Sequence, residues 1–345
     1  MKIGILTFHW ATNYGAVLQC YALQQTLAEM GHDVEVINYK PQRYDFTWKK
    51  YLRHPSSIKY IMRDYIQNKK ENLLVQFRDK YLNLTQRYYT NRDLNKISSN
   101  YDVVISGSDQ ILNPYFTNSG EGSPTSTYYL TFASKSTKKI GYAVSFGCTT
   151  YPKTAFFNAK EWISNFDKIG VREKSGIEIL NSFNYNNERI LVPDPTILRG
   201  KSLFSELKIT SPLIKDYYCV YVLRNNIKIN AEEKVFYIDE TNNPLSIEGW
   251  LGYISHSKGL ITNSYHGMIM AILFHVPFVV ILEKQKSISG MNDRFVTLLS
   301  QLNLMNRIAD SEESVVSICS KEIDWENVEQ LLIKFQNIGK SFLSL

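Results

Sequence analysis

The sequence predicts an α/β protein in which two Rossmann-like domains face a cleft. The chain opens on an apolar strand, an amphipathic helix and a second strand, and this order is typical of a parallel sheet covered by helices. Short apolar strands recur along the chain, and several end in polar residues. The length of 345 residues suits two domains of ~100–200 residues each. A hydrophobic fraction of 44% supplies enough apolar material for two cores.

The first domain begins with a strand over residues 2–8, a helix and a strand over residues 33–39. The helix carries apolar residues near helical spacing, and Gly31 follows where a helix often ends. Its preceding loop lacks the GxGxxG pattern, so a dinucleotide fingerprint is not supported. Helices are expected between about residues 57 and 81. Further strands are expected at 101–106, 139–146, 168–171 and 189–192.

The domain boundary is expected at Val192-Pro193-Asp194-Pro195, because two prolines favour a junction. The N-terminal domain would then span residues 1–193 and the C-terminal domain residues 194–345. The second domain is expected to contain strands at 217–223, 234–238, 259–262 and 277–282, and helices at 247–257, 266–275 and 292–302. A last helix over 325–342 is expected to pack back against the first domain.

An uncharged stretch over residues 259–282 is long enough to suggest a membrane helix. However, its polar residues, among them Asn263, His266 and His275, would be costly in lipid. The stretch divides better into a strand, a loop, a buried helix and a second strand. The start of the sequence lacks the pattern of a signal peptide. We therefore expect a cytoplasmic protein.

The four cysteines are scattered, with no CxxC pair and no histidine partner at metal-ligand spacing. They are expected to be buried thiols in a reducing compartment. Neither a metal site nor a cofactor is predicted.

The net charge of +6 is concentrated in one segment. Residues 40–100 contain 14 Lys and Arg against 5 Asp and Glu, a balance of +9, which leaves −3 for the rest of the chain. A solvated helical insertion is one explanation. A surface for an anionic partner, such as the inner face of a membrane, is the other. No nucleic-acid-binding motif accompanies the charge, so nucleic acid is not expected.

The segment Leu260–Gly267 (LITNSYHG) is the most informative stretch for function. A buried strand ends in small polar residues, and a helix begins next to His266 and Gly267. Free backbone N–H groups at a helix start favour anions, and Ser264 is a suitable cap. His266 could donate a proton to a bound substrate. The alternative is a capped helix with a structural histidine.

Three other positions follow predicted strands. Asp109 and Gln110 follow the strand ending at 106, where a carboxylate either caps the next helix or has a function. Arg172 follows the strand ending at 171, and its planar fork suits carboxylate or phosphate unless it pairs with Glu173 or Glu178. Asn13 could orient a ligand or form a turn. Asp194, between two prolines, is expected to form a turn.

Six segments together resemble the polysaccharide pyruvyl transferase family. They are Asn13–Leu23 (NYGAVLQCYAL), Asp102–Gln110 (DVVISGSDQ), Tyr142–Gly147 (YAVSFG), Val171–Ser175 (VREKS), Asp194–Thr196 (DPT) and Thr262–Gly267 (TNSYHG). Each is weak alone, but their order and spacing are specific. The resemblance implies a GT-B-like fold and transfer of pyruvyl from phosphoenolpyruvate to sugar hydroxyls, as a ketal, in surface or exopolysaccharide biosynthesis.

The resemblance also implies roles for the site residues. His266 matches the catalytic acid, and Arg172 and Arg294 match positions suited to the carboxylate and phosphate of the donor. Asp109 is our hypothesis for the base. The remaining predicted substrate-binding residues are Asn13, Gln110, Asn263, Ser264 and Gly267. The acceptor is expected to be a sugar linked to a lipid pyrophosphate or a nucleotide.

Two alternatives remain open at this level. A GT-B glycosyltransferase that uses a nucleotide sugar would share the fold, and a non-catalytic family member could bind glycan or lipid. The chain also departs from the family between residues 223 and 234, where the family places a helix and this sequence is short.

Overall fold

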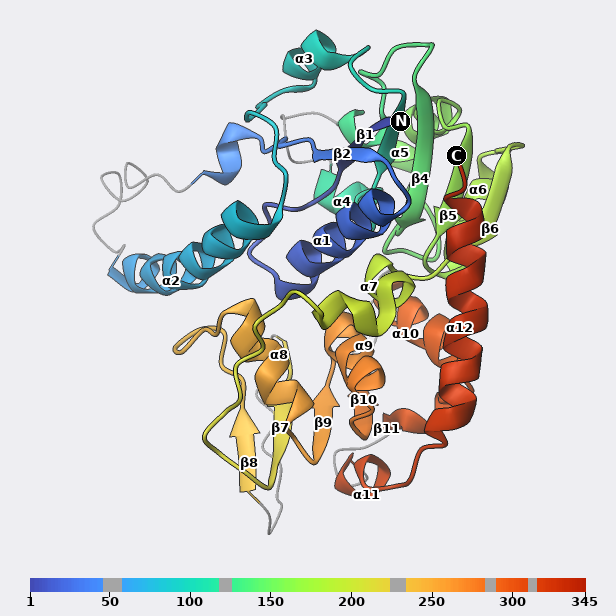
Figure 1. Cartoon of the computed structure of the whole chain (residues 1–345). Helices are drawn as coiled ribbons and strands as arrows, with labels where there is room; N and C mark the ends of the chain where they lie inside the picture. The colour runs from blue at the N-terminus through green and yellow to red at the C-terminus, as the bar shows by residue number, and fades with distance from the viewer. Residues whose placement is uncertain (46–57, 118–125, 224–233, 283–289, 310–314) are drawn as a thin grey trace.

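The structure, a computed structural model, describes residues 1–45, 58–117, 126–223, 234–282, 290–309 and 315–345. It contains two parallel sheets, each flanked by helices, stacked one above the other in Figure 1. The predicted α/β fold with two Rossmann-like domains is confirmed. The short connection between residues 223 and 234, where the family places a helix, falls on residues 224–233, which lie outside the described residues.

The first sheet has six strands in the order β2-β1-β3-β4-β5-β6, all parallel. The strands are β1 (Lys2–Leu6), β2 (Asp33–Val36), β3 (Val103–Ser106), β4 (Lys138–Val144), β5 (Lys168–Val171) and β6 (Glu188–Leu191). They lie within a few residues of the predicted strands. The central strands β3 and β5 are buried along their whole length, as expected where helices cover both faces.

The second sheet has five strands in the order β11-β10-β9-β7-β8, also all parallel. They are β7 (Tyr217–Tyr221), β8 (Lys234–Tyr237), β9 (Gly259–Thr262), β10 (Phe278–Ile281) and β11 (Ile308–Ala309). The sequence pattern missed β11, which has two residues and therefore no periodicity to read.

Helices connect the strands of both sheets. They are α1 (Tyr14–Glu29), α2 (Ile58–Tyr81), α3 (Asn91–Leu94), α4 (Pro114–Thr117), α5 (Lys153–Ile163), α6 (Lys174–Ser182), α7 (Pro195–Arg199), α8 (Ile247–Ser255), α9 (Tyr265–Phe274), α10 (Asp293–Gln301), α11 (Val315–Cys319) and α12 (Trp325–Phe342). The stretch over 259–282 is β9, α9 and β10, as predicted. Among the described residues, no helix is long and apolar enough to cross a bilayer.

The two domains meet through helices α1, α7 and α9, which lie between the sheets in Figure 1. The largest hydrophobic cluster continues through this contact. The Tyr14 ring stacks on Trp250 at 5.3 Å, and its hydroxyl donates to Leu245 O at 2.8 Å. Lys70 of α2 pairs with Glu240 at 2.8 Å across the same boundary. Apolar packing and buried polar contacts therefore fix how the two sheets face each other.

The last helix, α12, runs beside both domains in Figure 1. It packs on α7, and its final residues reach the six-stranded sheet. There the Lys168 ammonium donates to the carbonyl oxygen of Phe342, and the Phe342 ring lies 6.1 Å from that of Tyr142. The chain thus returns to the first domain after completing the second.

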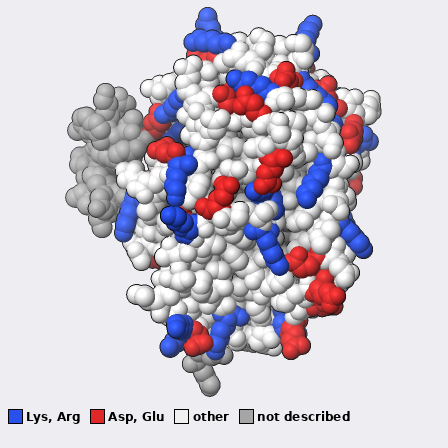
Figure 2. Space-filling model, viewed as in Figure 1, with Lys and Arg blue, Asp and Glu red and all other residues white. Residues whose placement is uncertain are grey.

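The basic segment over residues 40–100 is only partly described, because residues 46–57 lie outside the described part. Two cations of α2 are used internally: Lys70 pairs with Glu240, and Arg78 pairs with Glu71. On the face shown in Figure 2, blue and red side chains alternate across the surface. The four cysteines are buried free thiols, as predicted.

Candidate active site

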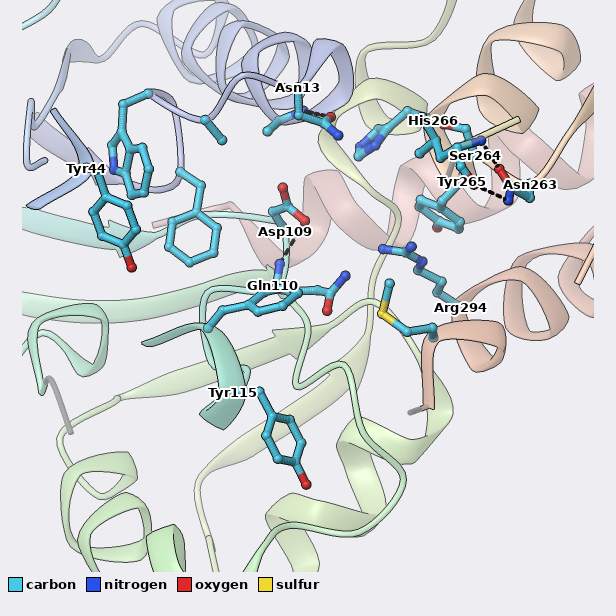
Figure 3. Close-up of a pocket in the computed structure, with 17 residues that line it drawn as sticks. Asn13, Tyr44, Asp109, Gln110, Tyr115, Asn263, Ser264, Tyr265, His266 and Arg294 are labelled. Atoms are coloured by element: carbon cyan, nitrogen blue, oxygen red, sulfur yellow. Dashed lines mark hydrogen bonds between the residues drawn. The ribbon is translucent and has the colours of Figure 1, made fainter. Parts of the chain in front are cut away.

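A cavity of about 420 Å³ lies between the domains, beyond the carboxyl ends of β1, β3, β7 and β9 (Figure 3). Ligands of parallel sheets gather at this edge. The residues that line the cavity are Phe8, Trp10, Ala11, Asn13, Ala16, Tyr44, Asp109, Gln110, Tyr115, Phe116, Leu223, Asn263, Ser264, Tyr265, His266, Met291 and Arg294. Seven of the nine predicted site residues are among them; Arg172 and Gly267 are not.

His266 lies in the first turn of α9, at the end of β9. Ser264 caps this helix, since its hydroxyl accepts from the Gly267 N–H at 3.2 Å, as predicted. The N–H groups of Tyr265 and His266 have no acceptor within the helix because both belong to its first turn. The start of α9 therefore offers backbone donors and a positive dipole end beside the imidazole.

The His266 imidazole packs directly on the backbone of α1 at Gly15. A Cβ at position 15 would lie 2.0 Å from Nδ1 and 2.2 Å from Cγ of His266. No side chain larger than hydrogen fits there without displacing the ring. Gly15 is part of the sequence pattern NYGAVLQ, but the pattern alone gave no reason for a glycine at this position.

Asp194 lies under His266. Its Oδ2 is 3.4 Å from His266 Nε2, 3.1 Å from Arg172 Nη1 and 3.1 Å from Ser108 Oγ. Burial opposes ionisation of this carboxyl group, but His266 and Arg172 hold its pKa well below the usual range. Asp194 also caps α7 through the Thr196 N–H. The prediction of a turn residue was therefore incomplete, because sequence alone does not show that β5, α7 and α9 converge on one carboxylate.

Arg172 is buried beneath the cavity and does not line it. Besides Asp194, its guanidinium lies 3.7 Å from Asp109 and 3.9 Å from Glu173. Burial disfavours the cation, but Asp194 and Asp109 raise its pKa above the usual value. The predicted partner Glu173 is thus present, and Asp194 is the closer one. Direct contact between Arg172 and a donor stays a prediction.

Arg294 differs from Arg172 in having no anionic partner. Its guanidinium forms no hydrogen bond or ion pair with any residue the structure describes, and it lines the cavity. It lies 5.4 Å from the ring of Tyr265 and 5.6 Å from that of Phe295. Burial and the nearby Arg172 lower its pKa to about 10. The carboxylates of Asp109 and Glu173 oppose this shift, but neither lies within ion-pair distance of Arg294 in the described part of the chain, so a ligand anion could pair with it directly.

Asp109 stands in the middle of the cavity, between Tyr44 on one side and His266 and Arg294 on the other (Figure 3). It adopts a left-handed backbone conformation with φ of 85°, a strained state for a residue other than glycine. Its Oδ1 accepts from the Gln110 N–H at 2.8 Å. No hydrogen bond from a described residue reaches Oδ2. The side chain does not cap the next helix, which was the alternative expectation.

The other predicted ligand-binding residues are held by local bonds. Asn13 caps α1 through the Ala16 N–H, and Gln110 accepts from Asn113 at 2.7 Å. The Asn263 amide bonds both backbone groups of Leu223 and so ties the end of β9 to the end of β7. Gly267 packs on Thr262 and Tyr221, and its N–H is used by Ser264. Their contacts with a substrate stay predictions.

The sequence analysis missed an aromatic side of the cavity. Phe8, Trp10 and Tyr44 line it together: the Trp10 ring is 4.6 Å from Tyr44 and 5.8 Å from Phe8. Aromatic residues directly after the first strand were the only available signal. Within the described ranges, no group of three or more His, Cys, Asp or Glu is arranged to hold a metal ion.

The family model for polysaccharide pyruvyl transferases matches residues 13–284. This chain belongs to that family. The match includes every predicted site residue except Arg294. No curated protein matches the sequence of this pyruvyl transferase family member.

Solved structures of the same fold are enzymes of GT-B architecture. A Staphylococcus aureus protein, MnaA, solved with UDP, superposes with a TM-score of 0.53 at 10% identity, over 96% of this chain and 90% of that one. A UDP-GlcNAc 2-epimerase from Methanocaldococcus jannaschii superposes with a TM-score of 0.53 at 9% identity, over 99% of each chain. At this identity the likeness shows the fold alone, and the GT-B-like prediction is confirmed.

Proposed function

We propose that this family member transfers the pyruvyl group of phosphoenolpyruvate to two hydroxyls of a sugar, forming a pyruvate ketal in surface or exopolysaccharide biosynthesis. The observation that carries the proposal is Arg294, a cation that lines the cavity on the same side as His266 and forms no hydrogen bond or ion pair with a described residue (Figure 3). An anionic donor would supply the missing counter-ion, and arginine binds carboxylate and phosphate with two parallel bonds.

The start of α9 supports binding of the same donor. The free N–H groups of Tyr265 and His266 and the helix dipole favour an anion, and they lie on the same side of the cavity as Arg294 (Figure 3). Phosphoenolpyruvate carries a carboxylate and a phosphate, and this end of the cavity has separate donors for two anionic groups.

The proposed reaction uses His266 as acid and Asp109 as base. His266 donates a proton to the methylene carbon, and a sugar hydroxyl then adds to the neighbouring carbon while losing its proton to Asp109. The bond from that carbon to the phosphate oxygen breaks and phosphate leaves. Asp109 passes its proton to the departing phosphate. A second hydroxyl of the same sugar then adds and closes the ketal, and its proton returns to His266, which restores both groups. Asp194 lies where its charge can pair with the protonated imidazole of His266.

The acceptor in this proposal is a sugar linked to a lipid pyrophosphate or to a nucleotide. A lipid-linked acceptor would bring the basic segment over residues 40–100 close to an anionic membrane. In the described part of the segment, five cations are already paired with carboxylates, so its other cations would supply this contact; the paired ones are Lys40, Lys70, Arg78, Arg87 and Lys96. Liposomes with and without anionic lipid, compared across a salt series, test it.

One rival is a glycosyltransferase that uses a nucleotide sugar, because the fold is shared with a protein solved with UDP and with a UDP-GlcNAc 2-epimerase. The other is a non-catalytic family member. Arg294, which has no ion pair with a described residue, and the buried pair of His266 and Asp194 speak against the second rival, since both arrangements are costly in a protein that only binds glycan. The choice of donor separates the first rival, because a nucleotide sugar is also an anion.

The test is to incubate the protein with phosphoenolpyruvate and a panel of nucleotide-linked and lipid-linked sugars, and to follow phosphate release and product mass. Phosphate release that depends on both donor and acceptor supports the proposal. Sugar transfer from UDP-sugars, with phosphoenolpyruvate inert, would establish the first rival. Donor binding without turnover for any acceptor is the result expected of the second.

A further inference from the structure

The cavity has two chemically different ends. One end carries Arg294, His266 and the start of α9. The other end, where Figure 3 labels Tyr44, is formed by the ring of Tyr44 together with those of Phe8 and Trp10, which pack beside it; we call these three rings the aromatic wall. Asp109 stands between the two ends. The mechanism proposed above uses the first end and Asp109, and it gives no role to the aromatic wall.

The rings of the wall are held in place by their neighbours. The ring centroid of Trp10 lies 4.6 Å from that of Tyr44 and 5.8 Å from that of Phe8. The Phe8 ring in turn packs edge-on against Tyr128, with 4.9 Å between the centroids. The Lys40 ammonium lies 5.9 Å from the Trp10 ring. Phe8, Trp10 and Tyr44 are all half-buried, so each still presents part of its ring to the cavity. A preformed aromatic surface with fixed geometry costs little entropy when a ligand binds.

We propose that the aromatic wall is the subsite for the acceptor, and that it seats the apolar face of a pyranose ring whose hydroxyls point to Asp109. The inference rests on the proposed function and names the place of its second substrate. One face of a pyranose carries mainly C–H groups, which pack on aromatic rings, while its hydroxyls need hydrogen-bond partners at the edge.

Asp109 supplies such a partner. Its Oδ2 receives no hydrogen bond from a described residue, whereas Oδ1 is used by the Gln110 N–H. The side chain is 17% exposed and lines the cavity. A pyranose ring on the aromatic wall would thus place a hydroxyl beside Asp109, the proposed base. Phosphoenolpyruvate would lie on the far side of Asp109, so that the base stands between the two substrates, as the reaction requires.

The position of Asp109 also favours a sugar over a nucleotide on the wall. A nucleotide base stacked there would have to lead its diphosphate past the Asp109 carboxylate to reach Arg294. Two like charges at close range are unfavourable in a partly desolvated site. A neutral sugar hydroxyl is instead attracted to the same carboxylate.

Saturation-transfer NMR with defined probes tests the inference. The probes are methyl β-D-glucopyranoside, methyl β-D-galactopyranoside and methyl α-D-mannopyranoside, each measured with and without phosphoenolpyruvate. We expect transfer to ring C–H protons for at least one glycoside. Trp10→Ala should weaken that binding roughly five- to tenfold, and Trp10→Phe should restore most of it. Trp162→Ala is the matched control, because Trp162 is also half-buried and pairs with Tyr129 outside the cavity.

Calorimetry with phosphoenolpyruvate on the same proteins separates the two proposals. Unchanged donor affinity in Trp10→Ala, together with lost glycoside transfer, supports the acceptor subsite. Absence of donor binding in the wild type would sink the proposed function, while the glycoside data still decide the role of the wall. Equal transfer in Trp10→Ala and wild type, no transfer to any glycoside, or UDP binding that depends on Trp10 and displaces the glycosides would each overturn the inference.

Discussion

The imidazole Nε2 of His266 lies 3.4 Å from Oδ2 of Asp194, and the two residues belong to segments that leave different sheets. His266 follows β9 of the second sheet, whereas Asp194 follows β6 of the first. The pair therefore forms only when the domains are correctly docked. The Asp194 carboxylate contacts both Arg172, which is buried below the cavity, and His266, which lines it.

The first prediction concerns this carboxylate. Asp194→Asn keeps the size and the cap of α7, because asparagine is an equally good cap, but removes the charge that faces His266 and Arg172. We expect kcat to fall at least tenfold with little change in the affinity for phosphoenolpyruvate. Stability should also fall, since an unpaired buried charge costs ~3–5 kcal/mol. Asp324→Asn is the control, because Asp324 caps α12 through the Asn327 N–H at an exposed position. Equal kcat in both variants would remove Asp194 from the mechanism.

The second prediction concerns Arg294. Arg294→Gln should weaken phosphoenolpyruvate binding roughly 10- to 100-fold, because hydrogen bonds to charged groups contribute ~1.5–3 kcal/mol each. Without ligand the variant should be at least as stable as the wild type, since it loses a cation that Arg172 repels. Calorimetry and thermal unfolding with and without donor measure both effects. Arg189→Gln is the control, because Arg189 lies in edge strand β6 and donates to Asn181 away from the cavity. If Arg294→Gln is less stable than the wild type but binds phosphoenolpyruvate with the same affinity, Arg294 has a structural role and does not bind the donor.

The third prediction concerns Gly15. Gly15→Ala should reduce turnover about as much as His266→Ala, because the new methyl group would overlap the imidazole. Alanine is favourable in a helix by ~0.5–1 kcal/mol relative to glycine, so unfolding need not accompany the loss. Gly249→Ala in α8 is a matched control, because its nearest contact would be an ordinary 3.5 Å to Ser246. Normal turnover in Gly15→Ala would show that the ring can move without consequence.

The sheets were predictable because buried parallel strands leave a strong signal. The strands over 168–171 and 259–262 were placed at their observed ends, since each is an apolar run bounded by polar residues. The motif residues His266 and Asp109 were also found, because polar residues directly after a buried strand stand out. These signals are local in the sequence.

The missed features depend on contacts between distant segments. Asp194 was read as a turn residue, which its capping bond to Thr196 supports, but its contact with His266 is made across 72 positions and leaves no local trace. Gly15 is required by a side chain from the other domain. The aromatic wall combines Phe8 and Trp10 with Tyr44, and no periodicity links them. Sequence reasoning found the residues of single loops and missed those that the docking of the domains brings together.

The fourth prediction concerns the backbone at Asp109. Its φ of 85° suits glycine, so Asp109→Gly should leave stability unchanged or raise it by about 1 kcal/mol, while Asp109→Ala should lower it by a similar amount. Both variants remove the proposed base and should lose most of the transfer activity, with donor binding retained. Urea unfolding and the phosphate-release assay measure the two effects. Activity close to wild type in Asp109→Gly would assign the base to another group.

The last prediction concerns His9, a buried histidine beside the aromatic wall. Its Nε2 lies 3.1 Å from Asn38 Oδ1 and its Nδ1 lies 3.2 Å from the Thr7 carbonyl oxygen. Burial lowers its pKa from 6.5 to about 4, although these two hydrogen bonds oppose the shift. Because the folded pKa lies below the unfolded value, the unfolded chain binds more protons between about pH 4 and 6.5. The free energy of unfolding should therefore fall as the pH drops through this window.

The loss attributable to His9 should reach up to about 3 kcal/mol at the acid end, at 1.36 kcal/mol for each unit of pKa shift. Urea unfolding at several pH values between 7.5 and 4 measures it. His9→Gln cannot take up this proton. Between pH 7.5 and 4 its free energy of unfolding should therefore fall less than that of the wild type, and the difference between the two falls is the loss attributed to His9. Other groups titrate in both proteins and cancel in this difference. Parallel curves for His9→Gln and wild type would mean that His9 accepts a proton as readily in the folded as in the unfolded chain.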